Sequence, residues 1–247
     1  MASHFARLTL VQTRAQLHQL PPQLVEQSGS LLERRRRRFL AARTLLAELM
    51  LKVHGIAQLP DIDLSASGRP HFVKSGLPDF SIAYAGNMVG VLLAEETCRA
   101  GLDMEIVQTY GRQATCNPQT FSSAERTWIN AQSDPYEACT QIRTIRQSIL
   151  KITGEKSDDT NALRLHPASG RLRSSTLPNI QAVCDVEGVM AWSCALSPGA
   201  HRLHLWEYDG SDGWHSLQSI NLCSLNMGPR ALRLSSLPAE KAPSVLR

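Results

Sequence analysis

Apolar spacing and helix-capping residues predict two long helices and the start of another helix. Over Leu31–Val53 the apolar residues recur at steps of three and four, as on the buried face of a helix, and Gly55 follows as a helix-ending residue. A second long helix is expected over Tyr136–Ile152, stopped by Gly154. Ser122–Glu125 has the chemistry of a helix N-cap, so another helix is expected to begin there.

Short apolar runs bounded by turn residues predict strands. Phe80–Tyr84 and Val89–Ala94 lie on either side of Ala85–Asn87, which predicts a hairpin, and Ser65–Pro70 predicts a turn. A helix followed by hairpin strands therefore occurs once in each half of the chain, a weak internal repeat. The other predicted strands are Phe5–Val11, His71–Val73, Ala162–His166, Ile180–Val186, Val189–Leu196 and His201–Tyr208.

Composition is typical of a folded protein with a sizeable core. The chain has 247 residues, of which 43% are hydrophobic. No apolar run reaches the roughly 20 residues that a membrane-spanning helix needs. Met1–Phe5 lacks the basic-then-apolar order of a secretory signal. We therefore expect a cytosolic (cytoplasmic) protein with no membrane partner.

The six cysteines are widely dispersed, with no C-x-x-C pair. This pattern argues against a zinc site and against a dense disulfide framework. We expect reduced cysteines that lie mostly in the core: Cys98, Cys116, Cys139, Cys184, Cys194 and Cys223.

The positive charge is modest overall but concentrated at one place. The formal net charge is +4, and Arg34–Arg38 is an unbroken run of arginines. Such a run indicates a local anion site more than a general polyanion binder. The rest of the chain lacks a basic face with interleaved aromatic residues, so no nucleic-acid partner is expected.

Gly101–Glu105 contains an acid-x-acid pair, Asp103 and Glu105. The pair follows the apolar run Met88–Ala94, so we expect it at the end of a strand, where residues two apart project on the same face. Two carboxylates so placed suit one hard cation. The alternative interpretation is a solvated strand end.

The order of motifs resembles the Sfp-type 4′-phosphopantetheinyl transferases of the holo-acyl-carrier-protein synthase superfamily. The resemblance extends over about residues 34–154, and beyond it the C-terminal strands fit only in type. The matching segments, in chain order, are Arg38–Leu46, Gly68–Phe72, Phe80–Gly86, Gly101–Glu105, Phe121–Glu125 and Arg143–Lys151.

The resemblance implies an α+β fold built as a pseudo-twofold pair of similar subdomains, each a helix packed on a small antiparallel sheet, with a ligand cleft between them. We expect residues 1–110 to form the N-terminal half and residues 111–220 the half with the catalytic helix. The stretch 221–247 is expected to be poorly ordered. Fusion of two such halves in one chain argues, by analogy, for a monomer.

The implied reaction moves the phosphopantetheine arm of coenzyme A to a serine of an apo acyl or peptidyl carrier protein, with Mg²⁺, and releases adenosine 3′,5′-bisphosphate. Carriers of fatty acid, polyketide and peptide pathways all remain open as partners. The resemblance implies metal ligation by Asp103, Glu105 and Gln147, and catalytic roles for Lys151, Gln147 and Glu105. The implied coenzyme A contacts are Arg38, Arg43, Arg69, Tyr84, Ala85, Asp103, Arg146 and Lys151.

The chain departs from the family pattern at several of these positions. Gln147 replaces a glutamate; its amide can ligate Mg²⁺ but cannot act as a general base, so water or Glu105 must accept the proton. Arg146 replaces a lysine and keeps the charge, and Arg143 replaces a tryptophan, which either opens the site or adds an anion contact. Tyr84 and the following alanine replace a histidine and a serine.

Two interpretations follow from these departures. The first is an active transferase, and it is favoured by the presence of Asp103, Glu105 and Lys151. The second is a noncatalytic relative that binds coenzyme A or a carrier protein and has lost transfer. For Arg34–Arg37 a solvated helix start stands beside an interpretation in which these arginines face an acidic carrier protein.

Overall fold

A computed structural model of the chain describes residues 2–10, 17–95, 97–107, 120–154, 162–177, 179–210, 213–222 and 231–239. Over these residues the protein is α+β, as predicted. The helices are α1 (Pro22–Ser28), α2 (Glu33–His54), α3 (Ser123–Asn130) and α4 (Pro135–Thr153), with short 3-10 turns at Leu17–Gln19 and Pro167–Ser169. The strands are β1 (Ser3–Thr9), β2 (Ile62–Leu64), β3 (Pro70–Phe72), β4 (Phe80–Ala85), β5 (Met88–Leu93), β6 (Arg99–Ile106), β7 (Leu163–His166), β8 (Arg171–Ser174), β9 (Gln181–Glu187), β10 (Met190–Ser197), β11 (Arg202–Asp209), β12 (Gly213–Asn221) and β13 (Leu232–Arg233).

Both long helices end where the sequence predicts. Gly55 and Gly154 take left-handed backbone conformations, with φ of 68° and 73°, that a residue with a side chain rarely adopts. At its start, α4 is capped by Asp134, whose Oδ1 accepts hydrogen bonds from two backbone N–H groups of the first turn. Ser122 and Glu125 form a reciprocal capping box at the start of α3. The three predicted helices are therefore confirmed.

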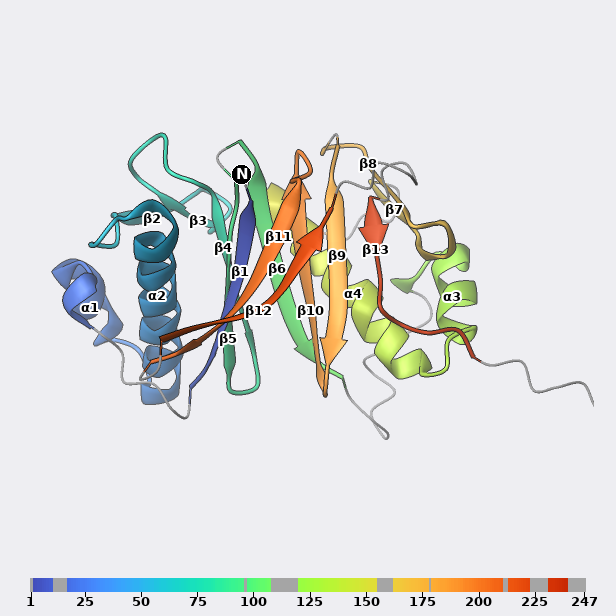
Figure 1. The fold of residues 1–247 in the computed structure, drawn as a ribbon, viewed down its shortest axis with the longest axis horizontal. Helices are drawn as coiled ribbons and strands as arrows, with labels where there is room; N and C mark the ends of the chain where they lie inside the picture. The colour runs from blue at the N-terminus through green and yellow to red at the C-terminus, as the bar shows by residue number, and fades with distance from the viewer. Residues whose placement is uncertain are drawn as a thin grey trace, which may run out of the picture.

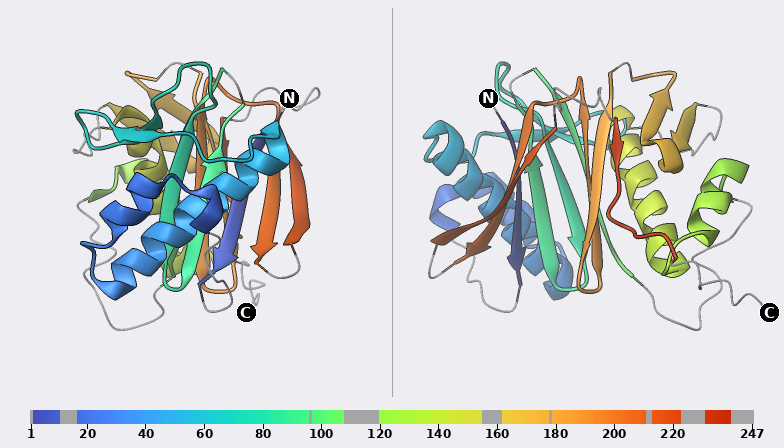
Figure 2. Two further views of the ribbon diagram at one scale, coloured as in Figure 1. Left: turned by 90° about the vertical axis from the view of Figure 1, so that its left-hand side faces the viewer. Right: turned by 45° about the vertical axis from the view of Figure 1, so that its right-hand side comes forward.

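Two larger sheets form the centre of the molecule, with helices on the outer sides (Figures 1 and 2). The first sheet has the order β12-β11-β1-β5-β4 and the second the order β13-β9-β10-β6. Helix α2 packs on β1 and β5 of the first sheet, and α4 packs on β6, β9 and β10 of the second. A buried apolar cluster with members from both sheets, including Phe5, Leu102 and Trp192, joins them.

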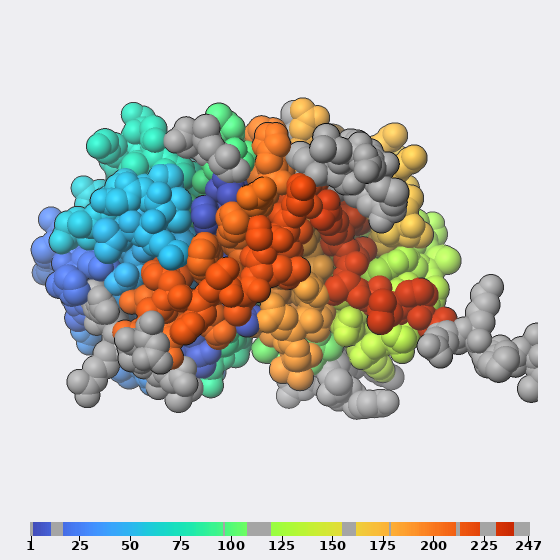
Figure 3. Space-filling view, in the orientation of Figure 1, coloured from blue at the N-terminus to red at the C-terminus, as the bar shows by residue number. Residues whose placement is uncertain are grey.

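Each half of the chain gives a strand to the sheet of the other half. After the β4–β5 hairpin, β6 leaves to pair antiparallel with β10, and after the β9–β10 hairpin, β11 leaves to pair parallel with β1. Figure 3 shows β11 and β12 running across one face of the molecule between the blue N-terminal part and the yellow-green helices. The order of helix, hairpin and exchanged strand is the repeat expected of a pseudo-twofold pair, and the strands before and after residue 110 interleave.

The structure corrects the predicted setting of the acid pair. Asp103 and Glu105 lie near the end of a strand, as predicted, but that strand is not the one formed by Met88–Leu93; it is a separate strand, β6. This strand pairs with β10, and the backbone N–H of Leu102 donates a 2.9 Å hydrogen bond to Ser81 Oγ on β4. Strand β6, which carries the acid pair, therefore lies between β4 of the first sheet and β10 of the second.

The C-terminal stretch also differs in part from the prediction. At its start, the described stretch 231–239 is packed, because Leu232 is buried and β13 pairs with β9, whereas residues 237–239 are exposed. Residues 223–230 and 240–247 of the predicted poorly ordered stretch lie outside the described residues. Along the part of the chain that is described, we find no helix both long and apolar enough to cross a membrane.

The prediction of six reduced cysteines is wrong at one position, because Cys139 on α4 is disulfide-bonded. Cys98, Cys184 and Cys194 are free and buried, as predicted. Cys116 and Cys223 lie outside the described residues.

Candidate active site

The site is built where α4 crosses β6 at very short range. A Cβ atom on Gly101 would lie 1.9 Å from the backbone oxygen of Ser148, so glycine is required at this position. The close approach brings the C-terminal half of α4 over the middle of β6. Two segments that are about 40 residues apart in the sequence thereby face one another.

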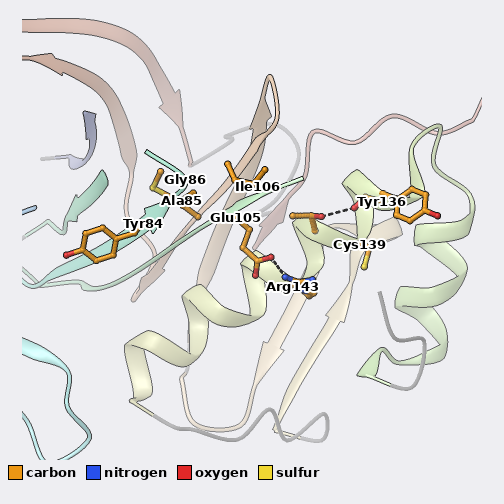
Figure 4. Close-up of a pocket in the computed structure, with 10 residues that line it drawn as sticks. Tyr84, Ala85, Gly86, Glu105, Ile106, Tyr136, Cys139 and Arg143 are labelled. Carbon is orange, nitrogen blue, oxygen red and sulfur yellow. Dashed lines mark hydrogen bonds and ion pairs between the residues drawn. The ribbon is translucent and has the colours of Figure 1, made fainter. Parts of the chain in front are cut away.

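The acid pair meets two cations from α4. Arg143, Gln147 and Lys151 follow at four-residue steps and share one face of the helix. Lys151 Nζ lies 2.8 Å from Asp103 Oδ1 and donates to the backbone oxygen of Leu102 at 2.8 Å. The Arg143 guanidinium pairs with Glu105 Oε2, a contact drawn in Figure 4. Each carboxylate of the pair therefore has a cation of the chain beside it.

Burial shapes the protonation of both carboxylates. It raises the pKa of Asp103, and the nearby Lys151 ammonium opposes that rise. Burial likewise raises the pKa of Glu105, against the opposing effect of Arg143, and the charge of Asp103 raises it further. Two carboxylates in such a partly buried, charged site are better suited to proton transfer or to binding a cation than two solvated surface carboxylates are.

Two hollows flank the acid pair along α4. One has a volume of about 250 Å³ and is lined by Tyr84, Ala85, Glu105 and Arg143, among others (Figure 4). The other has a volume of about 300 Å³ and is lined by Arg69, Gln147 and Lys151, among others. Gln147 is exposed there. Together the hollows expose to a ligand most of the residues that the sequence singled out.

Arg43 and Arg38 reach the β4–β5 hairpin from α2. Arg43 donates a 3.4 Å hydrogen bond to Tyr84 Oη, and its guanidinium stacks on Phe39 with Cζ 3.8 Å from the ring centroid. Burial lowers the pKa of Arg43 and raises that of Tyr84. Arg38 donates to the backbone oxygen of Gly86. Of these residues, Tyr84 and Gly86 line the first hollow, whereas Arg38 and Arg43 contact these hairpin residues and are not part of its lining.

Arg69 is anchored by an aspartate that the sequence analysis did not single out. It forms an ion pair with Asp79 and donates a 2.9 Å hydrogen bond to the backbone oxygen of Ala100. Asp79 also accepts from the backbone N–H of Ala100 at 2.8 Å. Arg69 therefore ties the turn before β3 to the start of β6 while it lines the second hollow.

The structure contradicts the predicted role of Arg146 as a phosphate contact. Its side chain is only 2% exposed and lies against the fully buried Glu125, with Nη2 at 2.7 Å and 2.9 Å from the two carboxylate oxygens. It lines neither hollow beside the acid pair. Glu125 in turn holds the start of α3, so this ion pair joins α3 to α4.

Metal-binding capacity rests on oxygen donors. Among the described residues, no group of three or more His, Cys, Asp and Glu side chains is placed to hold a metal ion. The predicted donors are two carboxylates and one amide, a set that falls outside such a group because Gln147 supplies an amide oxygen. These are hard oxygen ligands of the kind that Mg²⁺ prefers.

The arrangement defines an α+β protein with an acid pair, facing cations and hollows at the junction of its two sheets. Comparison with known proteins finds a relative that matches nearly end to end. The chain is 43% identical over 246 residues to the uncharacterized protein YieE of Escherichia coli K12, and the match covers 98% of each chain. YieE of the O6:H1 strain CFT073 matches equally. The chain belongs to the family of YieE. No family model matches it.

Two named transferases match a shorter part of the chain. A Haemophilus influenzae protein named provisionally as a 4′-phosphopantetheinyl transferase is 27% identical over 177 residues, or 67% of this chain and 74% of that protein. The 4′-phosphopantetheinyl transferase AcpT of E. coli K12 is 28% identical over 137 residues, or 55% of this chain and 66% of AcpT.

Proposed function

We propose that the protein is a 4′-phosphopantetheinyl transferase that moves the phosphopantetheine arm of coenzyme A to a serine of an apo acyl or peptidyl carrier protein. The observation that carries this proposal is the meeting of two distant motifs, with Lys151 Nζ 2.8 Å from Asp103 Oδ1. Partial similarity to two proteins named for this activity supports it.

The three proposed donors offer the oxygen ligands that Mg²⁺ prefers, but together with their neighbouring cations they carry little net negative charge to attract it. Asp103, Glu105 and Gln147 would hold the ion, and the ion would neutralise the diphosphate of coenzyme A. Gln147 contributes no negative charge, and both carboxylates already have a cation beside them. The metal site we propose is therefore weaker than one built from three carboxylates.

The residues of the chain account for the remaining steps. In the transfer, the serine oxygen bonds to the phosphorus that carries pantetheine, and the diphosphate P–O bond breaks with its electron pair leaving on adenosine 3′,5′-bisphosphate. Lys151 would meet a phosphate oxygen as a point charge. The serine proton must pass to Glu105 or water, because Gln147 is not basic.

Intact-mass spectrometry of apo carrier proteins tests the proposal. The carriers are incubated with the protein, coenzyme A and Mg²⁺, and a second series omits the metal. We expect at least one carrier to gain a single phosphopantetheine group, in a metal-dependent way, and to lose the gain with Asp103→Ala. No gain on any acyl or peptidyl carrier would contradict the proposal.

A second candidate function is a noncatalytic protein that binds coenzyme A or a carrier. The exposed amide of Gln147 favours it, because the general base of the implied mechanism is missing. The ion pairs of Asp103 and Glu105 favour it as well, since carboxylates so engaged also serve a purely structural role. This function predicts calorimetric binding of coenzyme A without transfer.

A further inference from the structure

Arg143 is a charged residue of the site to which the proposed reaction assigns no task. It extends from α4 into the hollow lined by Tyr84 and Ala85 and pairs with Glu105 (Figure 4). The side chains are partly accessible, 32% exposed for Arg143 and 20% for Glu105. The ion pair is thus open to exchange with a ligand in the hollow.

The pair changes what a divalent cation meets at the site. Asp103 and Glu105 carry −2, and Arg143 and Lys151 carry +2, so the four contacting groups sum to zero. The guanidinium also occupies Oε2 of Glu105. A divalent cation must therefore compete with Arg143 for Glu105, and it gains little from the local charge.

A phosphate ligand offers Arg143 an alternative partner. The planar guanidinium binds phosphate oxygens with two parallel hydrogen bonds, and a diphosphate carries more charge than one carboxylate. The hollow of about 250 Å³ beside Glu105 gives such a group room next to the guanidinium. If the guanidinium moves to the phosphate, Glu105 becomes available to the metal.

Building on the proposed function, we propose that Arg143 makes metal binding depend on the phosphate ligand. In the free protein it pairs with Glu105 and opposes the metal; when coenzyme A binds, it turns to the diphosphate and Glu105 takes the metal. Metal and coenzyme A then bind with positive coupling, which must be reciprocal.

Mn²⁺ binding measured by electron paramagnetic resonance tests this inference without any carrier protein. Titrations are made with and without coenzyme A, and protein-free titrations correct for the complex of Mn²⁺ with coenzyme A. We expect Arg143→Gln to bind Mn²⁺ on the order of tenfold more tightly than the unaltered protein when coenzyme A is absent. The tightening of Mn²⁺ binding by coenzyme A should shrink by a similar factor.

Two further variants make the result interpretable. Arg171→Gln removes one exposed arginine of β8 and should leave Mn²⁺ affinity unchanged, which controls for net charge. Arg143→Lys keeps the charge without the guanidinium fork, so its Mn²⁺ affinity should stay within about threefold of the unaltered protein while the coupling falls. If Arg143→Gln does not fold, this lysine variant decides.

Unchanged or weaker Mn²⁺ binding in Arg143→Gln would overturn the inference. So would a coupling factor that is the same in all variants. These readings are separate from the mass-spectrometric test of transfer. If the protein transfers phosphopantetheine but Mn²⁺ binding does not depend on Arg143, the proposed function stands and the proposed role of Arg143 is wrong. If Arg143→Gln binds Mn²⁺ more tightly but no transfer is detected, the role of Arg143 stands and the proposed function is wrong.

Discussion

At the scale of single residues, Gln147 limits the chemistry we propose. It stands between Arg143 and Lys151 on α4 and is exposed in the second hollow, where a substrate has access. We predict that Gln147→Glu raises the rate of transfer on the order of a hundredfold, because a positioned general base contributes at least that much and the added charge also tightens metal binding. Initial rates on one carrier protein, with saturating coenzyme A, measure the change.

The same substitution at a distance provides the control. Gln23→Glu on α1 makes an identical chemical change at an exposed residue and should leave the rate as it was. A Gln147→Glu protein that binds coenzyme A but transfers no faster would show that the missing carboxylate is not what limits turnover.

At the scale of elements, the buried pair Arg146–Glu125 holds α3 and α4 together. Arg146→Met leaves a fully buried carboxylate without its partner, so we predict a loss of about 3–5 kcal/mol in the free energy of unfolding. Denaturant titration measures this loss. The double variant Arg146→Met, Glu125→Leu removes both charges and should recover most of the free energy of unfolding that the single variant loses. About 1 kcal/mol should remain lost, because Glu125→Leu also removes the capping box of α3. A double variant no more stable than the single one would contradict this account.

The contrast between these elements shows what the sequence could and could not predict. Helix ends were predictable because Gly55 and Gly154 act locally, through backbone conformation. Strand β6 was predictable in principle, because Ala100, Leu102, Met104 and Ile106 alternate with glycine and acidic residues as in a half-buried strand. The prediction instead assigned the acid pair to the preceding apolar run. The burial of Arg146 was unpredictable from spacing alone, since it depends on a glutamate of another helix.

At the scale of the whole molecule, the exchanged strands bring sequence-distant residues into one fold. The acid pair faces α4 only because β6 crosses to the second sheet. In the same way β11 crosses to β1, where His4 and His204 are register partners with ring centroids 5.4 Å apart. The second crossing thus brings together two partly buried histidines that are 200 residues apart in the sequence, and their proximity affects stability.

That consequence is a dependence of stability on pH. Burial, together with the positive charges of His204, His54 and Lys52, lowers the pKa of His4 from 6.5 to about 4. The neutral ring accepts a 3.1 Å hydrogen bond at Nδ1 from Trp206 Nε1. Below pH 6.5 the unfolded chain binds a proton at this position that the folded chain refuses until about pH 4, so the free energy of unfolding falls as the pH drops through this window.

We predict that this histidine alone contributes a loss on the order of 2 kcal/mol between pH 7 and pH 4, after allowance for its partial solvent exposure. The His4→Gln variant isolates the effect, because an amide oxygen can still accept from Trp206 and does not titrate. Denaturant titrations of both proteins across this range should show the unaltered protein losing about this much more free energy of unfolding than His4→Gln between pH 7 and pH 4, with substitution of the exposed His166 of β7 by Gln as the matched control. Parallel curves for His4→Gln and the unaltered protein would mean that the His4 environment does not resist protonation, because other groups titrate alike in both and cancel in the difference.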